Sequence, residues 1–404
     1  MNILILTCNT GGGHNAVAAA LTEAFRQRGA DSRVLDGLSF VSRKASKFVS
    51  RWHTRFYRHY PQLYKAGYMS AEEEDGRPAP RHNPVETYLS RGARRLARYL
   101  QAERFDAVVC VHVIPALMMT MLRQNGGAPM PFCFVATDYT CSPTVGSCTP
   151  DICVIPHAEL AEEFIHCGIA ADTLLPAGIP TRSVFAAPTD RAAARQALSL
   201  PAEGRHILLM SGSIGCGPMS ALARQLDELL PEGDFATVLC GSNRQMLYAI
   251  QMRSLLRVQA VGFTSRVAQY MDSADLLVSK PGGISITEAA CKGVPMLLAD
   301  LVGGCETRNQ AFFSAHGWAA SCDTDAIADS ALSLLADDDR RRRMVETQRR
   351  SFDGQAAQRI ADAVLSRCGK ARVLLHTQAP AAELPALLRS LYNPSLAFLR
   401  ICRI

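Results

Sequence analysis

Short apolar runs alternate with longer segments of helical periodicity along most of the chain. In the first half, these runs predict strands at Asn2–Leu6, Ser32–Leu35, Ala107–Val111, Phe132–Ala136, Ile152–Ile155 and Thr173–Pro176. Segments with helical spacing, such as Asn15–Arg28 and Thr87–Gln101, separate the runs. Because parallel strands need crossover helices to connect them, the alternation predicts an α/β fold with a parallel sheet.

The same pattern starts again in the second half, with predicted strands at His206–Met210, Thr237–Cys240, Val258–Val261, Leu276–Ser279 and Met296–Ala299. A proline-containing stretch rich in alanine and charge precedes this restart. We therefore predict two doubly wound, Rossmann-like domains at 1–180 and 205–368, joined by a linker at 181–204 and followed by a tail at 369–404. The domains are expected to face each other across a cleft that holds a ligand at the carboxyl ends of the strands.

The composition of the 404-residue chain is that of a globular protein, with 48% hydrophobic and 20% charged residues. Its formal net charge of +6 disfavours a dedicated nucleic-acid-binding protein. Its 14 cysteines include no C-x-x-C pair, which is typical of reduced cysteines in a cytoplasmic protein rather than of disulfides or a zinc site. No basic leader and no apolar stretch of about 18 residues is present, so neither secretion nor a membrane span is expected.

Both predicted domains open with a strand, a glycine-rich turn and a helix. In the first domain Gly12 and Gly13 precede His14, and in the second Gly212 and Ser213 lie in the segment SGSIGCG. Glycine lets the backbone approach a ligand, and the N-terminus of the following helix attracts anions. At the tip of such a loop His14 is a candidate general base, the alternative being a histidine that caps a tight turn.

The segment SKPGGISITEAACKG, residues 279–293, is the most specific part of the sequence. Its turn and helix start, where a diphosphate could bind, comprise Gly282, Gly283, Ile284 and Ser285. Because a carboxylate repels phosphate, Glu288 is expected either to bind ribose hydroxyls or simply to favour the start of the helix. A later turn into a helix brings Glu306 and Asn309, whose side chains could bind sugar hydroxyls.

Several separate segments resemble one known family in the same order. They are GGGH near the start, then VCVHVIPALMM and VATDYT, and later CGSNRQM, VQAVGFTSRVAQYMDSADLLVSKPGG and KPGGISITEAACKGVPMLLADLVGGCETRNQAFF. Over about residues 1–368 the chain resembles the monogalactosyldiacylglycerol synthase and processive diacylglycerol glucosyltransferase family of inverting glycosyltransferases. The resemblance implies a GT-B fold, a UDP-sugar donor held mainly by the C-terminal domain, and a lipid acceptor at the N-terminal domain.

The resemblance also implies roles for residues at the donor. Glu288 corresponds to the glutamate that binds the ribose, and Gly283, Ile284 and Ser285 correspond to the turn that faces the diphosphate. The backbone of Phe263 corresponds to the position that meets the uracil. Glu306 and Asn309 correspond to the pair that faces the donor hexose.

At the acceptor, the resemblance implies a base. His14 corresponds to the histidine of the glycine loop, a proposed base, and Asp138 to an aspartate that acts as base or orients the acceptor. The family often has a histidine or tryptophan shortly after this aspartate, whereas Tyr139–Pro143 follow here, so the acceptor contacts differ from the family pattern.

This chemistry needs a base for the acceptor hydroxyl and backbone dipoles that stabilise the departing diphosphate, so no metal or other cofactor is expected. The acidic run Asp337–Asp339 is followed by Arg340–Arg343 in a helical context. Such a run is typical of a solvated helix face rather than a metal site.

A segment rich in basic and aromatic residues, 37–71, contains no Asp or Glu. Aromatic residues repeat every four positions at Phe48, Trp52, Phe56 and Tyr60, beside a basic stripe formed by Lys47, Arg51, Arg55 and Arg58. The pattern predicts that residues 40–68 bind an anionic membrane surface, the alternative being a helix buried against the domain with a wet basic edge. The leucine-rich tail is either a second interfacial element or an ordinary packed helix.

Together these features predict a cytoplasmic enzyme, peripheral on the inner face of the cell membrane, that transfers glucose or galactose from a UDP-sugar to diacylglycerol or a related lipid with inversion. A polyprenyl-linked or non-lipid acceptor is the alternative within this class. A UDP-sugar epimerase and a non-catalytic UDP-sugar-binding regulator are the alternatives from other classes. Nucleic acid is not an expected partner.

Overall fold

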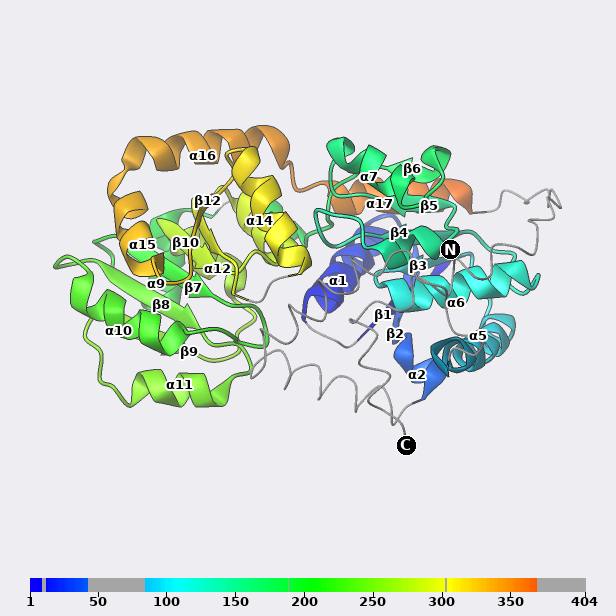
Figure 1. Ribbon diagram of the computed structural model, residues 1–404, viewed down its shortest axis with the longest axis horizontal. Helices are drawn as coiled ribbons and strands as arrows, with labels where there is room; N and C mark the ends of the chain where they lie inside the picture. The colour runs from blue at the N-terminus through cyan, green and yellow to red at the C-terminus, as the bar shows by residue number, and fades with distance from the viewer. Residues whose placement is uncertain (9–11, 43–83, 188, 302–303, 369–404) are drawn as a thin grey trace. The chain divides into compact units, whose positions relative to one another are not determined.

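The computed structural model describes residues 1–8, 12–42, 84–187, 189–301 and 304–368 (Figure 1). The described residues divide into two compact units. The first unit contains those of 1–180 together with those of 356–368, and the second contains those of 181–355. Each unit is built on one parallel sheet of six strands, as the alternating sequence pattern predicts.

The sheet of the first unit has the strand order β2-β1-β3-β4-β5-β6. Its strands are β1 (Asn2–Thr7), β2 (Asp31–Asp36), β3 (Ala107–Cys110), β4 (Phe132–Val135), β5 (Ile152–Val154) and β6 (Leu174–Leu175). All six predicted strands of this half are present, each within one residue of the expected ends. The central strand β1 is buried from Ile3 to Thr7 without alternation, as expected for a parallel strand covered on both faces.

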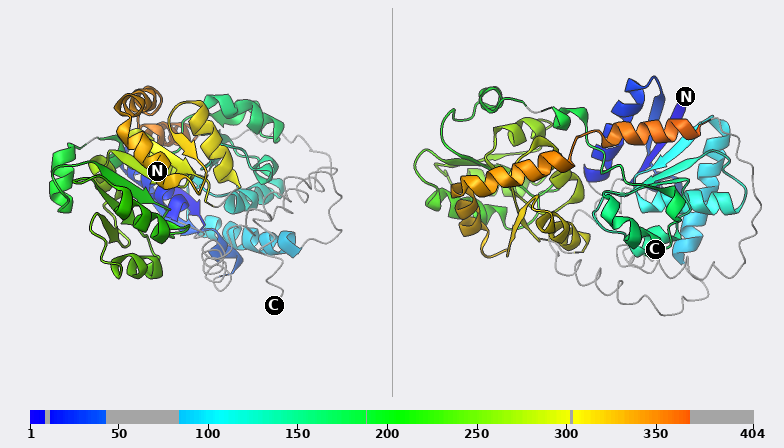
Figure 2. Two further views of the ribbon diagram at one scale, coloured as in Figure 1. Left: turned by 60° about the vertical axis from the view of Figure 1, so that its left-hand side comes forward. Right: turned by 90° about the horizontal axis from the view of Figure 1, so that it is seen from above.

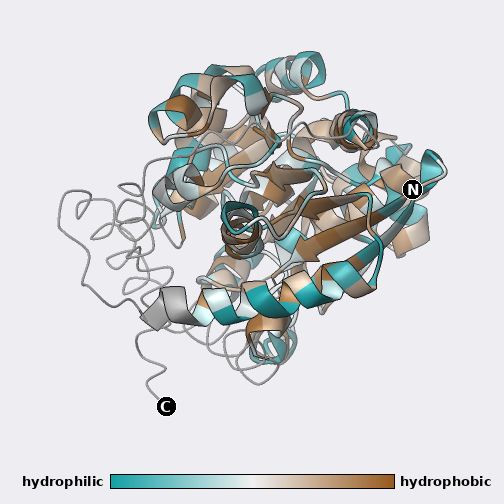
Figure 3. Cartoon of the chain, turned by 90° about the vertical axis from the view of Figure 1, so that its right-hand side faces the viewer, coloured by the Kyte–Doolittle hydropathy of each residue, from teal (hydrophilic) through white to brown (hydrophobic). Residues whose placement is uncertain are grey.

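Helices connect these strands. They are α1 (Gly12–Gln27), α2 (Leu38–Val41), α5 (Pro84–Ala102), α6 (Val113–Gln124) and α7 (Ala161–His166), with short 3₁₀ turns η1 (Pro143–Ser147), η2 (Ala158–Leu160) and η3 (Ala171–Thr173). On α1, Val17, Leu21 and Phe25 recur at helical spacing and are fully buried. Figure 3 shows the resulting pattern, with apolar strands inside and mixed apolar and polar helices around them.

The second unit is coloured from green to orange in Figure 2. Its sheet has the strand order β12-β11-β10-β7-β8-β9. Its strands are β7 (His206–Met210), β8 (Phe235–Leu239), β9 (Val258–Val261), β10 (Leu276–Ser279), β11 (Met296–Ala299) and β12 (Ala320–Cys322). Sequence reasoning missed β12, because this edge strand has three residues, of which Ser321 is exposed, and shows no apolar run.

The helices of the second unit lie mostly between its strands. They are α8 (Ser183–Ala186), α9 (Arg191–Leu198), α10 (Met219–Leu229), α11 (Arg244–Gln251), α12 (Val267–Ser273), α13 (Gly283–Lys292), α14 (Cys305–Ala315), α15 (Ile327–Ala336) and α16 (Asp338–Ser351). The core contains side chains from β7, β8, β10 and β11 together with α10, α11 and α15.

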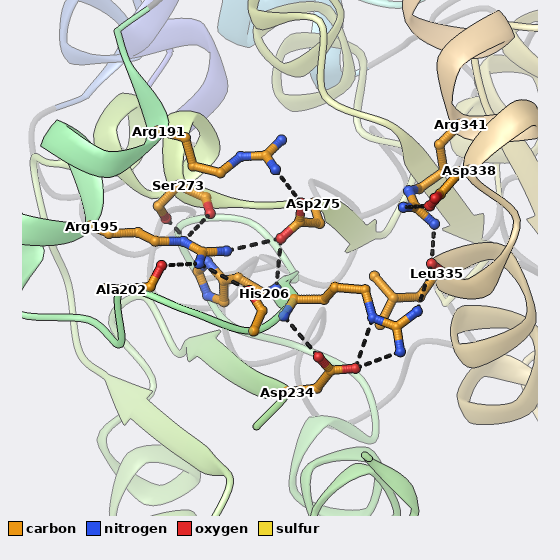
Figure 4. A network of polar contacts seen from close by, with 12 residues as sticks. Arg191, Arg195, Ala202, His206, Asp234, Ser273, Asp275, Leu335, Asp338 and Arg341 are labelled. Carbon is orange, nitrogen blue, oxygen red and sulfur yellow. Dashed lines mark hydrogen bonds and ion pairs between the residues drawn. The ribbon is translucent and has the colours of Figure 1, made fainter. Parts of the chain in front are cut away.

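The stretch predicted as a linker, 181–204, is part of the second unit. Arg195 of α9 is buried and donates to Asp275 Oδ2 at 2.9 Å, and the same oxygen accepts from the backbone N–H of His206 at 2.8 Å (Figure 4). Arg191 of α9 forms a second ion pair with Asp275. Two of the charges in the stretch predicted as an interdomain linker therefore belong to an ionic network around the nearly buried Asp275.

The last helix of the predicted C-terminal domain, 205–368, is also not part of the second unit. α17 (Ala356–Arg367) belongs to the first unit, where it packs on α1 and β5. Ile360 and Val364 are buried, Arg359 donates to the carbonyl of Ala177 at 2.8 Å, and Asp362 pairs with Arg28. The sequence shows that this helix is amphipathic but not which sheet it covers.

In the described part of the chain, none of the helices combines the length and apolar character that a bilayer crossing requires. The predicted interfacial segment falls almost entirely on residues 43–83, and the predicted tail comprises 369–404; both lie outside the described residues.

Candidate active site

The predicted glycine turns and His14 follow strands at the point in each sheet where the strand order reverses, whereas Asp138, Phe263, Glu306 and Asn309 follow other strands. In the first unit this switch point lies between β1 and β3, and in the second between β7 and β10. Loops leaving the carboxyl ends of two such strands diverge to opposite faces and leave a crevice that binds ligands in doubly wound folds. His14 follows β1 and His112 follows β3, whereas Gly212 follows β7 and Gly282 follows β10.

In the first unit, α1 begins at Gly12, earlier than the sequence indicated, so Gly12, Gly13 and His14 form its first turn. The Nδ1 atom of His14 is buried and has no hydrogen-bond partner among the described residues. Its ring contacts the His112 ring edge to face, with the centroids 4.8 Å apart. The structure thus brings together side chains that follow β1 and β3.

Asp138, which follows β4, is close enough to act electrostatically on His14. Burial lowers the pKa of the His14 imidazole below its ordinary value, while the Asp138 carboxylate and a hydrogen bond with the Val111 backbone partly offset this. The imidazole is therefore neutral at neutral pH and able to accept a proton. This pairing of the two predicted catalytic residues is the arrangement that a general base requires.

Sequence reasoning did not assign a role to His112. Its Nδ1 accepts the backbone N–H of Ile114 at 3.1 Å and caps α6. This hydrogen bond places the ring proton of a neutral His112 on Nε2. The available signal was its position directly after a buried strand and before a helix, the same position that singled out the glycine loop.

In the second unit, the loop after β7 carries Gly212 and Ser213. Gly212 has a φ of +77°, a conformation that favours glycine. The carbonyl of Ser213 accepts the backbone N–H of Ser242 at 2.9 Å, and the Asn243 side chain donates to the carbonyl of Gly215 at 2.8 Å. The loops after β7 and β8 therefore hold each other in place.

The turn after β10 leads into α13, whose N-cap residue is Gly282. The first helical hydrogen bond runs from the Ile286 N–H to the Gly282 carbonyl. The N–H groups of the three preceding residues, Gly283, Ile284 and Ser285, come before it and form the positive end of the helix. The diphosphate site expected from the sequence thus has the backbone arrangement that binds anions.

Glu288 lies on α13, one turn beyond this helix start, and is 8% exposed. Burial raises the pKa of its carboxyl group to about 8, although nearby Arg182 acts to lower it. Farther along α13, Lys292 donates to the carbonyl of Ala187 and to Asp272, which fixes the helix. A buried carboxyl group in this position can accept hydrogen bonds from a diol.

Glu306 and Asn309 lie on α14 beside the same turn. Asn309 is fully buried and donates to the carbonyl of Pro281 at 2.9 Å, while Glu306 forms a buried ion pair with Lys280. In the structure Asn309 thus holds the turn that leads to Gly282, and its contact with a hexose stays a prediction. Lys280 had no assigned role in the sequence.

Phe263 follows β9 and has a 75% exposed side chain. The contact that the sequence resemblance assigns to Phe263 uses its backbone, which lies just after the carboxyl end of the edge strand β9.

The acidic run 337–339 lies at the start of α16. Asp337 accepts the Arg340 N–H, and Asp338 and Asp339 pair with Arg341 and Arg342. This is the solvated helix face predicted from the sequence.

Solved structures with the same architecture are those of MurG from Acinetobacter baumannii, HepE from Anabaena in complex with UDP-glucose, and UDP-GlcNAc 2-epimerase from Neisseria meningitidis. The TM-scores are 0.56, 0.56 and 0.59 at 16%, 17% and 13% identity. The matches cover 90%, 91% and 91% of this chain and 99%, 99% and 100% of theirs. Fold and site therefore define a protein of the GT-B class.

Family models divide the chain into two parts. Residues 14–181 match the monogalactosyldiacylglycerol synthase model, and residues 220–351 match glycosyl transferases group 1. The chain thus contains a monogalactosyldiacylglycerol synthase domain and a glycosyl transferases group 1 domain, and the curated proteins similar to it over most of its length include diacylglycerol glycosyltransferases.

Two curated relatives illustrate the range of proteins to which this chain is similar. The processive diacylglycerol beta-glucosyltransferase of Staphylococcus saprophyticus is 25% identical over 340 residues, 82% of this chain and 84% of its own. The probable chloroplastic monogalactosyldiacylglycerol synthase of Glycine max is 28% identical over 331 residues, 78% of this chain and 61% of its own.

Proposed function

We propose that the protein is an inverting hexosyltransferase that moves glucose or galactose from a UDP-sugar to diacylglycerol or a related lipid. One observation carries the proposal above the rest: the switch points of both sheets hold the chemistry that this transfer needs, in a chain related to diacylglycerol glycosyltransferases. The first unit supplies a histidine with a buried Nδ1 within the electrostatic influence of an aspartate, and the second supplies a glycine-flanked helix N-terminus followed by a buried glutamate.

In the proposed reaction, the acceptor hydroxyl oxygen bonds to the anomeric carbon and its proton passes to His14, oriented by Asp138. The bond from the anomeric carbon to the diphosphate breaks, and its electron pair stays on the diphosphate oxygen. The N-terminus of α13 stabilises that charge, and Glu288 accepts hydrogen bonds from the ribose. These groups supply base and counter-charge, so the proposal includes no metal, and the rate should be unchanged by EDTA.

The test is incubation of the purified protein with UDP-glucose or UDP-galactose, with and without diacylglycerol in anionic vesicles, followed by mass spectrometry of lipid and nucleotide. A hexose added to the lipid supports the proposal and identifies the sugar. UDP released without glycolipid would show that the acceptor class is wrong. An isomerised sugar nucleotide formed without acceptor would favour an epimerase, and binding without turnover a regulator.

The proposal places the enzyme on the cytoplasmic face of the membrane, bound to anionic lipid through residues 40–68. Seven cations without a carboxylate over 37–71 support it, each contributing about 1 kcal/mol near such a surface. Changing Arg51, Trp52 and Arg55 together should abolish salt-sensitive sedimentation with anionic vesicles. Unchanged sedimentation would remove this segment from membrane binding.

A further inference from the structure

Lys280 lies where the two glycine turns of the second unit's switch point meet. It directly follows β10, and its Nζ forms an ion pair with Glu306 Oε1. A Cβ atom placed on Gly212 would lie 3.0 Å from the Lys280 Cε, and one on Gly282 would lie 3.3 Å from the Nζ. Both turns are thus glycine where they face this side chain.

The surroundings of Lys280 are largely dry. Its side chain is 13% exposed and that of Glu306 is 8% exposed. A buried ion pair gains little net stability because both charges lose their hydration, so holding α14 in place does not by itself account for this pair. Neutral hydrogen bonds already fasten α14: Asn309 donates to the carbonyl of Pro281 and Gln310 to the carbonyl of Leu298, both at 2.9 Å.

The charge balance of the site points to a ligand instead. A diphosphate at the start of α13 would approach Glu306, whose carboxylate repels it. An ammonium group between the two removes this repulsion, and its several N–H donors let it bind a carboxylate and a phosphate oxygen together. Because Lys280 lies beside Glu306, which is expected to face the hexose, its ammonium group is expected to bind the phosphate next to the sugar.

We propose that Lys280 is the residue that binds the sugar-proximal phosphate of the nucleotide donor and neutralises charge on the departing diphosphate. Glu306 holds the ammonium group in position until the donor enters. This inference rests on the proposed function, since it adds a residue to the proposed donor site. It predicts that the lysine distinguishes nucleoside diphosphates from nucleosides and nucleoside monophosphates.

The test measures the binding of uridine, UMP and UDP by calorimetry to the intact protein and to three variants. Lys280→Met alone would leave Glu306 buried without its cation and could unfold the site, so the decisive pair is Glu306→Gln against Lys280→Met/Glu306→Gln. Thermal unfolding of both verifies the fold. Arg342→Met, which removes a 69% exposed cation from α16, controls for net charge.

We expect the double variant to bind UDP about 10- to 100-fold more weakly than Glu306→Gln, the loss typical of a hydrogen bond to a charged group. Uridine and UMP should bind both variants alike, and Arg342→Met should match the unchanged protein. Equal UDP affinity in the decisive pair, or an equal loss for uridine, would overturn the inference. If the unchanged protein binds UDP but forms no glycolipid, the proposed transfer to lipid fails while the inference about Lys280 stands or falls on the decisive pair; if it does not bind UDP, the proposed function and the inference fail together.

Discussion

His14 is the residue whose chemistry depends most on its neighbours, because its ring contacts the His112 ring and Asp138 acts on it electrostatically. We expect His14→Ala to lower turnover by about 10²- to 10⁴-fold, the usual contribution of a general base, without weakening UDP binding. The lowered pKa keeps the imidazole neutral at neutral pH. The acidic limb of the kcat/KM profile should therefore have its midpoint below the ordinary histidine value of about 6.5.

Near-normal turnover of His14→Ala, or a midpoint above the ordinary value, would contradict the assignment. His14→Asn provides a second test, since it preserves polarity but cannot act as a base at these pH values.

Glu288 makes a second prediction at this scale. Its pKa of about 8 means that the carboxyl group is protonated at neutral pH in the free protein and ionises above it. The carboxylate is the stronger acceptor for ribose hydroxyls, so uridine affinity should rise between about pH 6.5 and about pH 8.5. Uridine is the suitable ligand because it has no phosphate to titrate, and Glu288→Gln should remove this rise.

The same shift determines the sign of the effect on stability. A carboxyl group with a raised pKa favours the folded state fully below its unfolded value, 4.5, and this contribution is lost as the pH rises through about 8. The free energy of unfolding in urea should therefore fall for the unchanged protein between pH 4.5 and about 8, relative to that of Glu288→Gln. The opposite slope would show that ligand-free Glu288 is ionised.

At the scale of elements, the ion pairs of α9 with Asp275 explain why 181–204 packs into the second unit. Arg191 and Arg195 both pair with Asp275, but their side chains are 54% and 5% exposed. We expect Arg195→Met to destabilise the second unit by about 3–5 kcal/mol, because it removes the buried counter-charge of Asp275 and leaves that carboxylate with the half-exposed Arg191 as its cation. Arg191→Met is the matched control and should cost about 0–1 kcal/mol. Equal losses in urea unfolding would contradict the network in Figure 4.

Elements also differ in how far the sequence predicted them. Eleven strands were predicted from their apolar runs, since a strand covered on both faces must be apolar throughout. The three-residue edge strand β12 lacked that signal. Gly282 to Ser285 were predicted as an anion site from sequence, because the glycine turn and helix start, which the structure shows, are local features. The partner of Lys280 was not, because Glu306 is 26 residues away.

At the scale of the whole molecule, α17 tests the division into units. Ile360 is fully buried where α17 packs with the first unit, so Ile360→Ala should destabilise that unit by about 2–5 kcal/mol. UDP binding, which we propose for the second unit, should persist at denaturant concentrations that unfold the first. Ser366→Ala, on the exposed side of α17, should change neither.

If Ile360→Ala instead destabilises the second unit, α17 belongs to the C-terminal domain, 205–368, as predicted from the sequence.

The sequence by itself determined the two parallel α/β sheets and the glycine turns, because apolar runs, helical spacing and glycine each report a local physical requirement. Asp138 and Phe263 were candidates only through the family resemblance. The tertiary structure alone decided that α9 joins the second unit, that α17 returns to the first, that His112 contacts His14 and that Lys280 pairs with Glu306. These are contacts between segments distant along the chain. Local patterns show that a side chain must be buried or paired, whereas the packing of the whole fold selects its partner.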